Sequence, residues 1–152
     1  LSNSDAALLA SIFSLISIPF SMTIPSLTTR LSDGHRQIML AIISIAGMIG
    51  IAMLLYPSNN FLYWLVAHLL IGTACSALFP CFSLKTSSPE KTAQLSGLAQ
   101  TGGYILAAFG PALFGYSFEL FQSWIPAVLA LLAIDVIMTI SLFMVDRADK
   151  IL

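Results

Sequence analysis

The length of the uncharged segments restricts the fold of this chain more than any other feature. Between Arg36 and Lys85 the sequence contains no Asp, Glu, Lys or Arg, and the remaining charges fall mainly in short gaps between further apolar runs. Only 9% of the residues are charged, whereas a soluble domain carries about 25%. So few charges cannot cover a water-exposed surface, and the pattern therefore indicates that lipid surrounds most of the chain.

Five segments are long and apolar enough to cross a bilayer, which takes about 20 mostly apolar residues each. We expect helices over residues 5–28, 37–56, 61–84, 89–118 and 125–145. Ser88-Pro89-Glu90 is typical of a helix start, because it offers a capping hydroxyl, a first-turn proline and a carboxylate at the positive end of the helix dipole. A helical bundle in water would need polar outer faces, and residues 38–55 provide none. The predicted fold class is an all-α polytopic membrane protein.

The basic residues predict the orientation of these helices. In a five-span arrangement all six fall on one side of the membrane: Arg30, Arg36, Lys85, Lys91, Arg147 and Lys150. Basic residues favour the cytoplasmic side, so we expect the C-terminus in the cytoplasm and the N-terminus outside. Aromatic residues of the kind that favours membrane interfaces lie at the opposite helix ends: Tyr56, Tyr63, Trp64, Tyr116 and Trp124.

The predicted helix over residues 89–118 has a stripe of small residues at every fourth position. Its members are Ala99, Gly103, Ala107, Pro111 and Gly115. Such a stripe lets another helix approach closely, which matters in lipid because apolar surface alone gives little drive for association. Gly110-Pro111 predicts a bend, since proline removes a backbone hydrogen bond. Static packing and a bend that takes part in gating both remain open.

Polar residues inside the predicted spans mark candidate cavity positions. Gln100 and Tyr104 lie one helical turn apart, and each needs either an interhelical hydrogen bond or a water-filled cavity. Ser17 and Ser21 continue from Ser14 at helical spacing beside two prolines, which predicts a bent helix facing a cavity. Serine hydroxyls also bond back to their own helix, so this second interpretation stays open.

Two titratable residues lie within the spans. His68 can bind a proton near neutral pH, although a neutral, hydrogen-bonded histidine is the alternative. Asp135 lies near the middle of the last helix, where an ionised carboxylate costs about 2.5–3.5 kcal/mol on insertion scales. It must therefore be protonated, paired or facing water. Both residues are candidates for proton coupling, and a neutral structural role is the alternative for each.

The sequence argues against several other classes of function. The net charge of −1 gives no reason to expect a nucleic-acid partner. No phosphate-binding loop, metal-ligand spacing or cofactor motif occurs, and Cys75 and Cys81 are interpreted as free thiols. His68 and Cys75 are nearly two turns apart on one helix, too far for a nucleophile and its base. We therefore expect no enzyme, no metal and no cofactor.

One stretch of the fourth helix reads Leu95-Ser96-Gly97-Leu98-Ala99-Gln100-Thr101-Gly102-Gly103-Tyr104, followed by Gly110-Pro111. It resembles the eleventh helix of the major facilitator superfamily, and more narrowly its branch of cyanate permease and the 2-nitroimidazole transporter. The resemblance covers essentially the whole chain. It implies five helices, the eighth to the twelfth, of a C-terminal six-helix bundle, which would be a fragment whose partner is the missing N-terminal half.

The same resemblance implies a secondary carrier in a bacterial inner membrane that moves a small solute by alternating access. Substrate-cavity residues would be Gln100, Tyr104, His68, Ser17 and Ser21. The expected solute is a cyanate-like anion or a small heterocycle, with protons as a candidate coupling partner. Alternatives are a drug–proton antiporter of the same superfamily, a membrane scaffold that transports nothing, and an intramembrane enzyme.

The first interhelical connection resembles the second-half copy of the superfamily's cytoplasmic loop motif, which helps to control opening. The residues that carry this likeness are Arg30, Asp33 and Arg36. Thr29 stands where that motif often has an aspartate. Simple topology-setting charge is the alternative role for this segment.

Overall fold

The computed structural model of the chain describes residues 2–75, 82 and 84–147. The described part is helical and contains no strand, which confirms the all-α polytopic fold class. Its helices are α1 (Asn3–Thr28), α2 (Asp33–Met53), α3 (Phe61–Cys75), α5 (Pro89–Ala108), α6 (Gly110–Phe121) and α7 (Ile125–Arg147).

Four helical stretches are long and apolar enough to cross a membrane: α1, α2, the α5–α6 stretch and α7. Helix α3 is a shorter apolar helix. The helix expected over residues 61–84 begins at the predicted residue, but most of its last part falls outside the described residues. The structure thus supplies a helix in each of the five predicted regions and describes four of them at spanning length.

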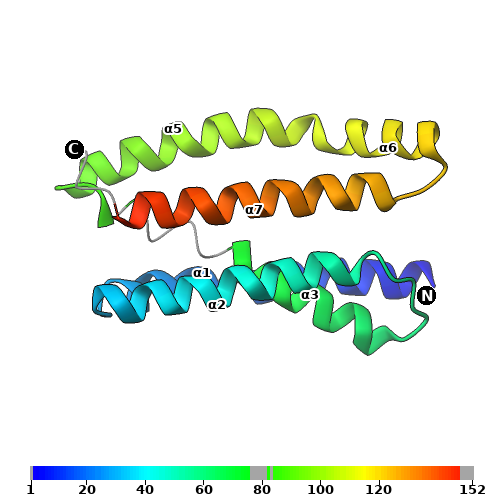
Figure 1. Cartoon of the computed structure of the whole chain (residues 1–152), viewed down its shortest axis with the longest axis horizontal. Helices are drawn as coiled ribbons and strands as arrows, with labels where there is room; N and C mark the ends of the chain where they lie inside the picture. The colour runs from blue at the N-terminus through cyan, green and yellow to red at the C-terminus, as the bar shows by residue number, and fades with distance from the viewer. Residues whose placement is uncertain (1, 76–81, 83, 148–152) are drawn as a thin grey trace.

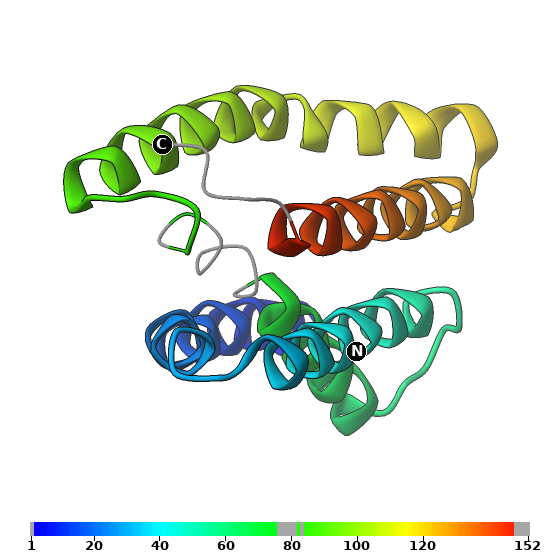
Figure 2. The same cartoon turned by 60° about the vertical axis from the view of Figure 1, so that its left-hand side comes forward.

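The helices lie roughly alongside one another in two groups (Figures 1 and 2). Helices α1, α2 and α3 form one group, and α5 and α6 run along α7 in the other. The two groups meet where α7 packs on α2. The end of α1 and the start of α2, the start of α5 and the end of α7 all lie at the left-hand end of Figure 1. The basic residues of these connections therefore gather at one end of the molecule.

A small core joins three of the helices. Ile24 of α1, Leu40 and Ile43 of α2, and Leu142 of α7 are all buried and form one cluster. Leu40 is 1% exposed. Most other large apolar residues face outward, as expected of helices surrounded by lipid, because the bilayer requires no polar outer face. The core therefore holds the helices in register without enclosing a large interior.

The closest helix packing is between α2 and α3, where two glycines of α2 remove side chains from the contact. A Cβ atom on Gly50 would lie 2.9 Å from the carbonyl oxygen of Ala67, and one on Gly47 would lie 2.5 Å from Cβ of Ala74. Close backbone approach of this kind stabilises helix pairs in lipid. The sequence pattern had drawn attention to the small-residue stripe of residues 99–115 instead.

That stripe packs against nothing in the described part of the chain. Helices α5 and α6 contain no buried residue. A Cβ atom added at Gly103, Gly110 or Gly115 would meet no atom within 4 Å. Any tight packing partner for this surface must therefore come from outside the described residues.

Several helix ends differ from their predicted positions by a few residues, and two differences bear on the candidate site. Helix α2 begins at Asp33, four residues before the predicted start, since a carboxylate is stabilising at the positive end of a helix. Asp33 and Arg36 therefore belong to the first helical turn and not to the connection. The helix expected over residues 89–118 is divided at Phe109, whose N–H bonds to Leu106 only three residues back. Helix α6 then starts at Gly110 and runs to Phe121.

Both described turns at the other end of the molecule are held by aromatic side chains. In the α2–α3 turn, the Trp64 indole N–H donates to the carbonyl of Ser58 at 2.6 Å. In the α6–α7 turn, Trp124 stacks on Phe118 with ring centroids 4.5 Å apart. Gln122 adopts a left-handed backbone with φ of 51° and ends α6 there. These aromatics therefore close the turns, in addition to being suited to an interface.

We predict that Gly50→Ala destabilises the full-length protein by roughly 1–3 kcal/mol, because the added methyl group forces backbone apart at the α2–α3 contact. Gly34→Ala is the control on the same helix, because its Cβ would meet no atom within 4 Å. Thermal unfolding in detergent measures both. Equal midpoints for the two variants would show that the close contact is unimportant.

Candidate functional site

The polar pair of α5 lies on an uncovered surface. Gln100 is exposed, and its amide nitrogen donates to Oγ of Ser96 on the same helix at 2.8 Å. Tyr104 is 72% exposed. Within the described residues, α5 has its main contacts only with the adjoining α6, so no other helix covers the pair. An amide and a phenol facing lipid would lose hydrogen bonds that water supplies. This surface therefore needs either water or a polar partner.

The α1 serines satisfy their hydroxyls within their own helix. Ser14 donates to the carbonyl of Ala10 at 3.1 Å, Ser17 to that of Ser14 at 2.8 Å, and Ser21 to that of Ile18 at 2.8 Å. Back-bonding of this kind often bends a helix. The hydroxyl oxygens keep lone pairs that can accept a bond, but their protons are already used.

His68 is tied to its own helix and to α1. Its Nδ1 lies 2.7 Å from the carbonyl oxygen of Trp64. A carbonyl oxygen can only accept, so Nδ1 carries a proton and Nε2 is the nitrogen that can bind another. Phe13 of α1 contacts the imidazole edge to face at 6.1 Å between centroids. The ring also lines a shallow depression with Ala6, Leu9 and Trp64.

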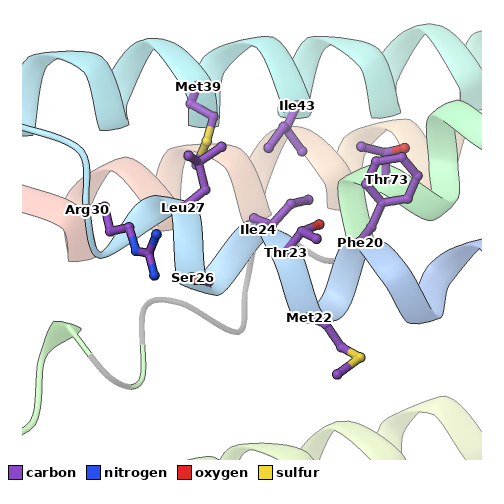
Figure 3. Close-up of a pocket in the computed structure, with 10 residues that line it drawn as sticks. All are labelled: Phe20, Met22, Thr23, Ile24, Ser26, Leu27, Arg30, Met39, Ile43 and Thr73. Atoms are coloured by element: carbon purple, nitrogen blue, oxygen red, sulfur yellow. The ribbon is translucent and has the colours of Figure 1, made fainter.

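An open groove of about 590 Å³ runs along α1 beside α2 and α3 (Figure 3). Its wall is mostly apolar, with Phe20, Ile24 and Ile43 among the side chains, and Arg30 stands at the end near the α1–α2 connection. Gln100, Tyr104 and His68 do not line it. The structure thus places the sequence-predicted cavity residues on separate surfaces and does not bring them together in one pocket.

A charge network at the end that carries the basic residues joins α2 to α7. Arg36 Nε donates to Oδ1 of Asp146 at 2.6 Å, and its Nη2 contacts Oδ1 of Asp33 at 2.9 Å. Gln37 donates to the second Asp146 oxygen at 3.3 Å. The side chains of Arg36 and Asp146 are only 12% and 1% exposed, whereas that of Asp33 is 87% exposed. The strong pair is therefore the one between α2 and α7.

A third segment joins this network through Lys85. Its ammonium group donates to the backbone carbonyl of Asp146 at 2.8 Å, and the residue is buried. Sequence reasoning missed Asp146, although a signal was present. A carboxylate in the last turn of a helix opposes the helix dipole unless a cation compensates it, and Arg36 in the first turn of α2 provides that cation.

Asp135 lies apart from all of these groups, near the middle of α7. It lines a smaller cavity between α2, α3 and α7, and its Oδ2 is buried without a hydrogen-bond partner. Cys75 lines the same cavity. Among the described residues there is no group of three or more His, Cys, Asp or Glu side chains that could hold a metal ion.

Comparison with known proteins decides what this set of helices is. The chain matches the Major Facilitator Superfamily over residues 1–151. It belongs to this superfamily. The membership fits the apolar helices and the multi-pass membrane fold of the chain.

Two curated proteins that are similar to this chain carry the names of transporters. The "Uncharacterized transporter YycB" of Bacillus subtilis is 29% identical over 136 residues, covering 88% of this chain and 33% of the relative. A "Putative anionic 4-hydroxy-benzoate permease" of Thauera aromatica is 39% identical over 79 residues, covering 51% of this chain and 48% of the relative. The chain thus spans about a third to a half of their lengths. No solved structure matches it.

We predict that Asp146→Asn destabilises the full-length protein by roughly 3 kcal/mol, because it leaves the Arg36 guanidinium largely buried without its charge partner. Asp33→Asn removes the exposed partner of the same arginine and should lower stability by less than about 1 kcal/mol. Thermal unfolding at low and high salt measures both. A smaller effect of Asp146→Asn than of Asp33→Asn would contradict the assignment of the strong pair.

Proposed function

We propose that this chain forms part of the C-terminal half of a secondary carrier, which moves a small solute across the membrane by alternating access. The observation that carries the proposal is the uncovered surface of α5 and α6. It combines a glutamine and a tyrosine with a stripe of small residues, and no described helix covers either. In a superfamily carrier, the missing half of the protein supplies a cover, and the polar pair then faces the space between the halves.

The physical argument for a cavity rests on hydrogen bonding. Gln100 offers amide N–H groups and a carbonyl, and Tyr104 offers a hydroxyl, one turn apart on α5. In hydrocarbon, each unpaired group of this kind costs about 2–7 kcal/mol of lost hydration. Water in a central cavity, or a solute displacing that water, satisfies them. The surrounding small residues leave room for the solute and for the approach of a neighbouring helix.

The proposed solute class is a small anion or a small polar heterocycle. The helix motif of residues 95–104 supports this assignment through its resemblance to the cyanate and 2-nitroimidazole branch. The name of the Thauera relative, an anionic 4-hydroxy-benzoate permease, supports a carboxylate-bearing aromatic as another member of the class. The two neutral donors of α5 suit such solutes, since both solute types are hydrogen-bond acceptors.

We also propose roles for the remaining candidate residues. Arg30 is exposed at the groove end and is available for a contact that changes as the halves move. Arg36 is held by Asp146, which keeps α2 and α7 together as one unit during that motion. Ser17, Ser21 and His68 would supply further solute contacts from α1 and α3. The division at Phe109, before Gly110-Pro111, gives α5 and α6 a place to bend relative to each other.

The proposed location is a bacterial inner membrane with the C-terminus in the cytoplasm. The gathering of basic residues at one end of the helices supports this orientation (Figure 1). Aromatic residues of the two opposite turns, Trp64 and Trp124, are consistent with the outer interface.

Uptake by the full-length protein in proteoliposomes tests the proposal. Cyanate, 2-nitroimidazole and 4-hydroxybenzoate are offered in turn, each with and without an imposed pH gradient. Saturable uptake of one of them supports the solute class. Export of a cationic drug driven by inward proton flow would favour the drug–proton antiporter instead. Transport of none of these compounds would remove the assignment.

For a solute that is transported, we predict that Gln100→Ala and Tyr104→Phe each raise KM by about 5–13-fold, because each removes one hydrogen bond worth about 1–1.5 kcal/mol. Tyr116→Phe is the matched control, since Tyr116 is an exposed tyrosine of α6 near the opposite end from the basic connections. The initial rates of uptake measure all three variants. Unchanged KM in both α5 variants would exclude the pair as solute contacts.

A further inference from the structure

The cavity between α2, α3 and α7 has one polar feature that the carrier proposal does not use. It has a volume of about 230 Å³, and apolar side chains such as Ile51, Ile71 and Leu131 dominate its lining. Asp135 is the one carboxyl group in this lining. Its Oδ2 atom is buried and accepts no hydrogen bond. A polar atom without a partner in an apolar setting is rare, because it costs about as much as a lost hydrogen bond.

Among the described residues, no cation pairs with this carboxylate. The α2 residues of the lining are Gly47, Ile51 and Leu54, none of which is ionisable, and the α7 neighbours in the lining are apolar too. From α3 the lining includes Cys75, a thiol that is either neutral or negative. The two ion pairs of the described residues both involve Arg36 and do not include Asp135. An ionised Asp135 would therefore be uncompensated, at a large cost in free energy.

The lining also argues against a metal cation as the partner. Calcium takes 6–8 oxygen ligands and magnesium six, most of them carboxylates, carbonyls or waters. Of the described residues in this lining, only Asp135 supplies a side-chain oxygen. One carboxylate among aliphatic side chains cannot replace the hydration shell of such an ion. A proton needs only one oxygen atom, and it removes the charge that makes burial unfavourable.

Gly47 gives the carboxyl group its space. A Cβ atom at Gly47 would lie 3.8 Å from Oδ2 of Asp135, so the side chain of α7 reaches into the part of α2 that the glycine leaves open. The same glycine lies at the close α2–α3 contact. The position of the carboxyl group is therefore linked to the packing of three helices.

We propose that Asp135 is a proton-binding site inside the membrane, separate from the polar surface of α5. On release, the O–H bond of the carboxyl group breaks and the proton passes to water entering the cavity, leaving a carboxylate. That carboxylate keeps the water in place, which loosens the α2–α7 contact next to it. On binding, a hydronium ion returns the proton, water leaves, and α7 seats on α2 again. The use of this proton in coupled transport rests on the proposed carrier function.

This arrangement differs from a static buried acid in one respect: the proton must exchange. The α2–α7 contact is anchored at one end by Arg36 and Asp146. Motion around Asp135 can therefore leave that end closed while the middle of the contact opens. The protonation of Asp135 then depends on how tightly α7 packs against α2, and in turn it shifts that packing equilibrium.

Infrared difference spectroscopy of the full-length protein in proteoliposomes tests the proposal without any transport assay. At neutral pH the wild type should show the carbonyl stretch of a protonated carboxylic acid that Asp135→Asn lacks. Raising the pH should remove this band and produce a carboxylate band. Asp33→Asn is the control, because Asp33 is exposed and its removal should leave the acid band intact.

Labelling with a hydrophobic carbodiimide, dicyclohexylcarbodiimide, gives a second readout, since this reagent reacts with protonated carboxyl groups in apolar surroundings. Mass spectrometry should find the adduct on Asp135 at neutral pH, with less at alkaline pH. The absence of an acid band due to Asp135 at neutral pH would overturn the proposal. An acid band that persists unchanged to strongly alkaline pH would also overturn it, by showing a static buried acid. Failure of solute uptake would leave both readouts unaffected.

Discussion

The scarcity of hydrogen-bond partners in lipid is the constraint on which this structure depends. Backbone groups in hydrocarbon must bond within their own segment, so the described chain is built of helices joined by short turns. Serine hydroxyls of α1 bond back to their helix for the same reason. Charged groups are placed where water or each other can satisfy them, and the basic connections therefore gather at one end. The exceptions are Gln100 and Tyr104 of α5 and the carboxyl group of Asp135, and these exceptions suggest a function.

Much of the architecture could be predicted from the sequence, because the lengths of apolar segments and the positions of charged residues are local properties. Helices α3 and α5 begin at their predicted residues, and the helix motif of residues 95–104 led to the superfamily that the comparison confirms. Pairings between distant segments could not be predicted in this way. Arg36 and Asp146 are 110 residues apart, and neither local sequence indicates that the two side chains pair. Small residues were equally ambiguous: Gly47 and Gly50 form the close helix contact, while the longer stripe of α5 and α6 meets no described neighbour.

The candidate site was predicted less completely than the fold, for a related reason. Gln100 and Tyr104 could be recognised as unusual because polar side chains in a span need partners, and the structure finds them uncovered. Their cover could not be predicted, because no described helix packs on this surface. The chain spans only about a third to a half of its curated relatives. The structure does supply a firm support, since the core and the Arg36–Asp146 pair hold α1, α2 and α7 together, while α6 contacts α7 and α5 contacts mainly α6.

We propose that these helices cross a membrane with all their basic connections on the cytoplasmic side. Sided labelling of the full-length protein in intact cells tests this directly, after all of its native cysteines are replaced by serine. Single cysteines are introduced by Asn59→Cys in the α2–α3 turn and by Lys91→Cys at the start of α5. The account predicts that a membrane-impermeant maleimide labels position 59 in intact cells and position 91 only after the membrane is opened. Labelling of both positions in intact cells, or of position 91 alone, would contradict it.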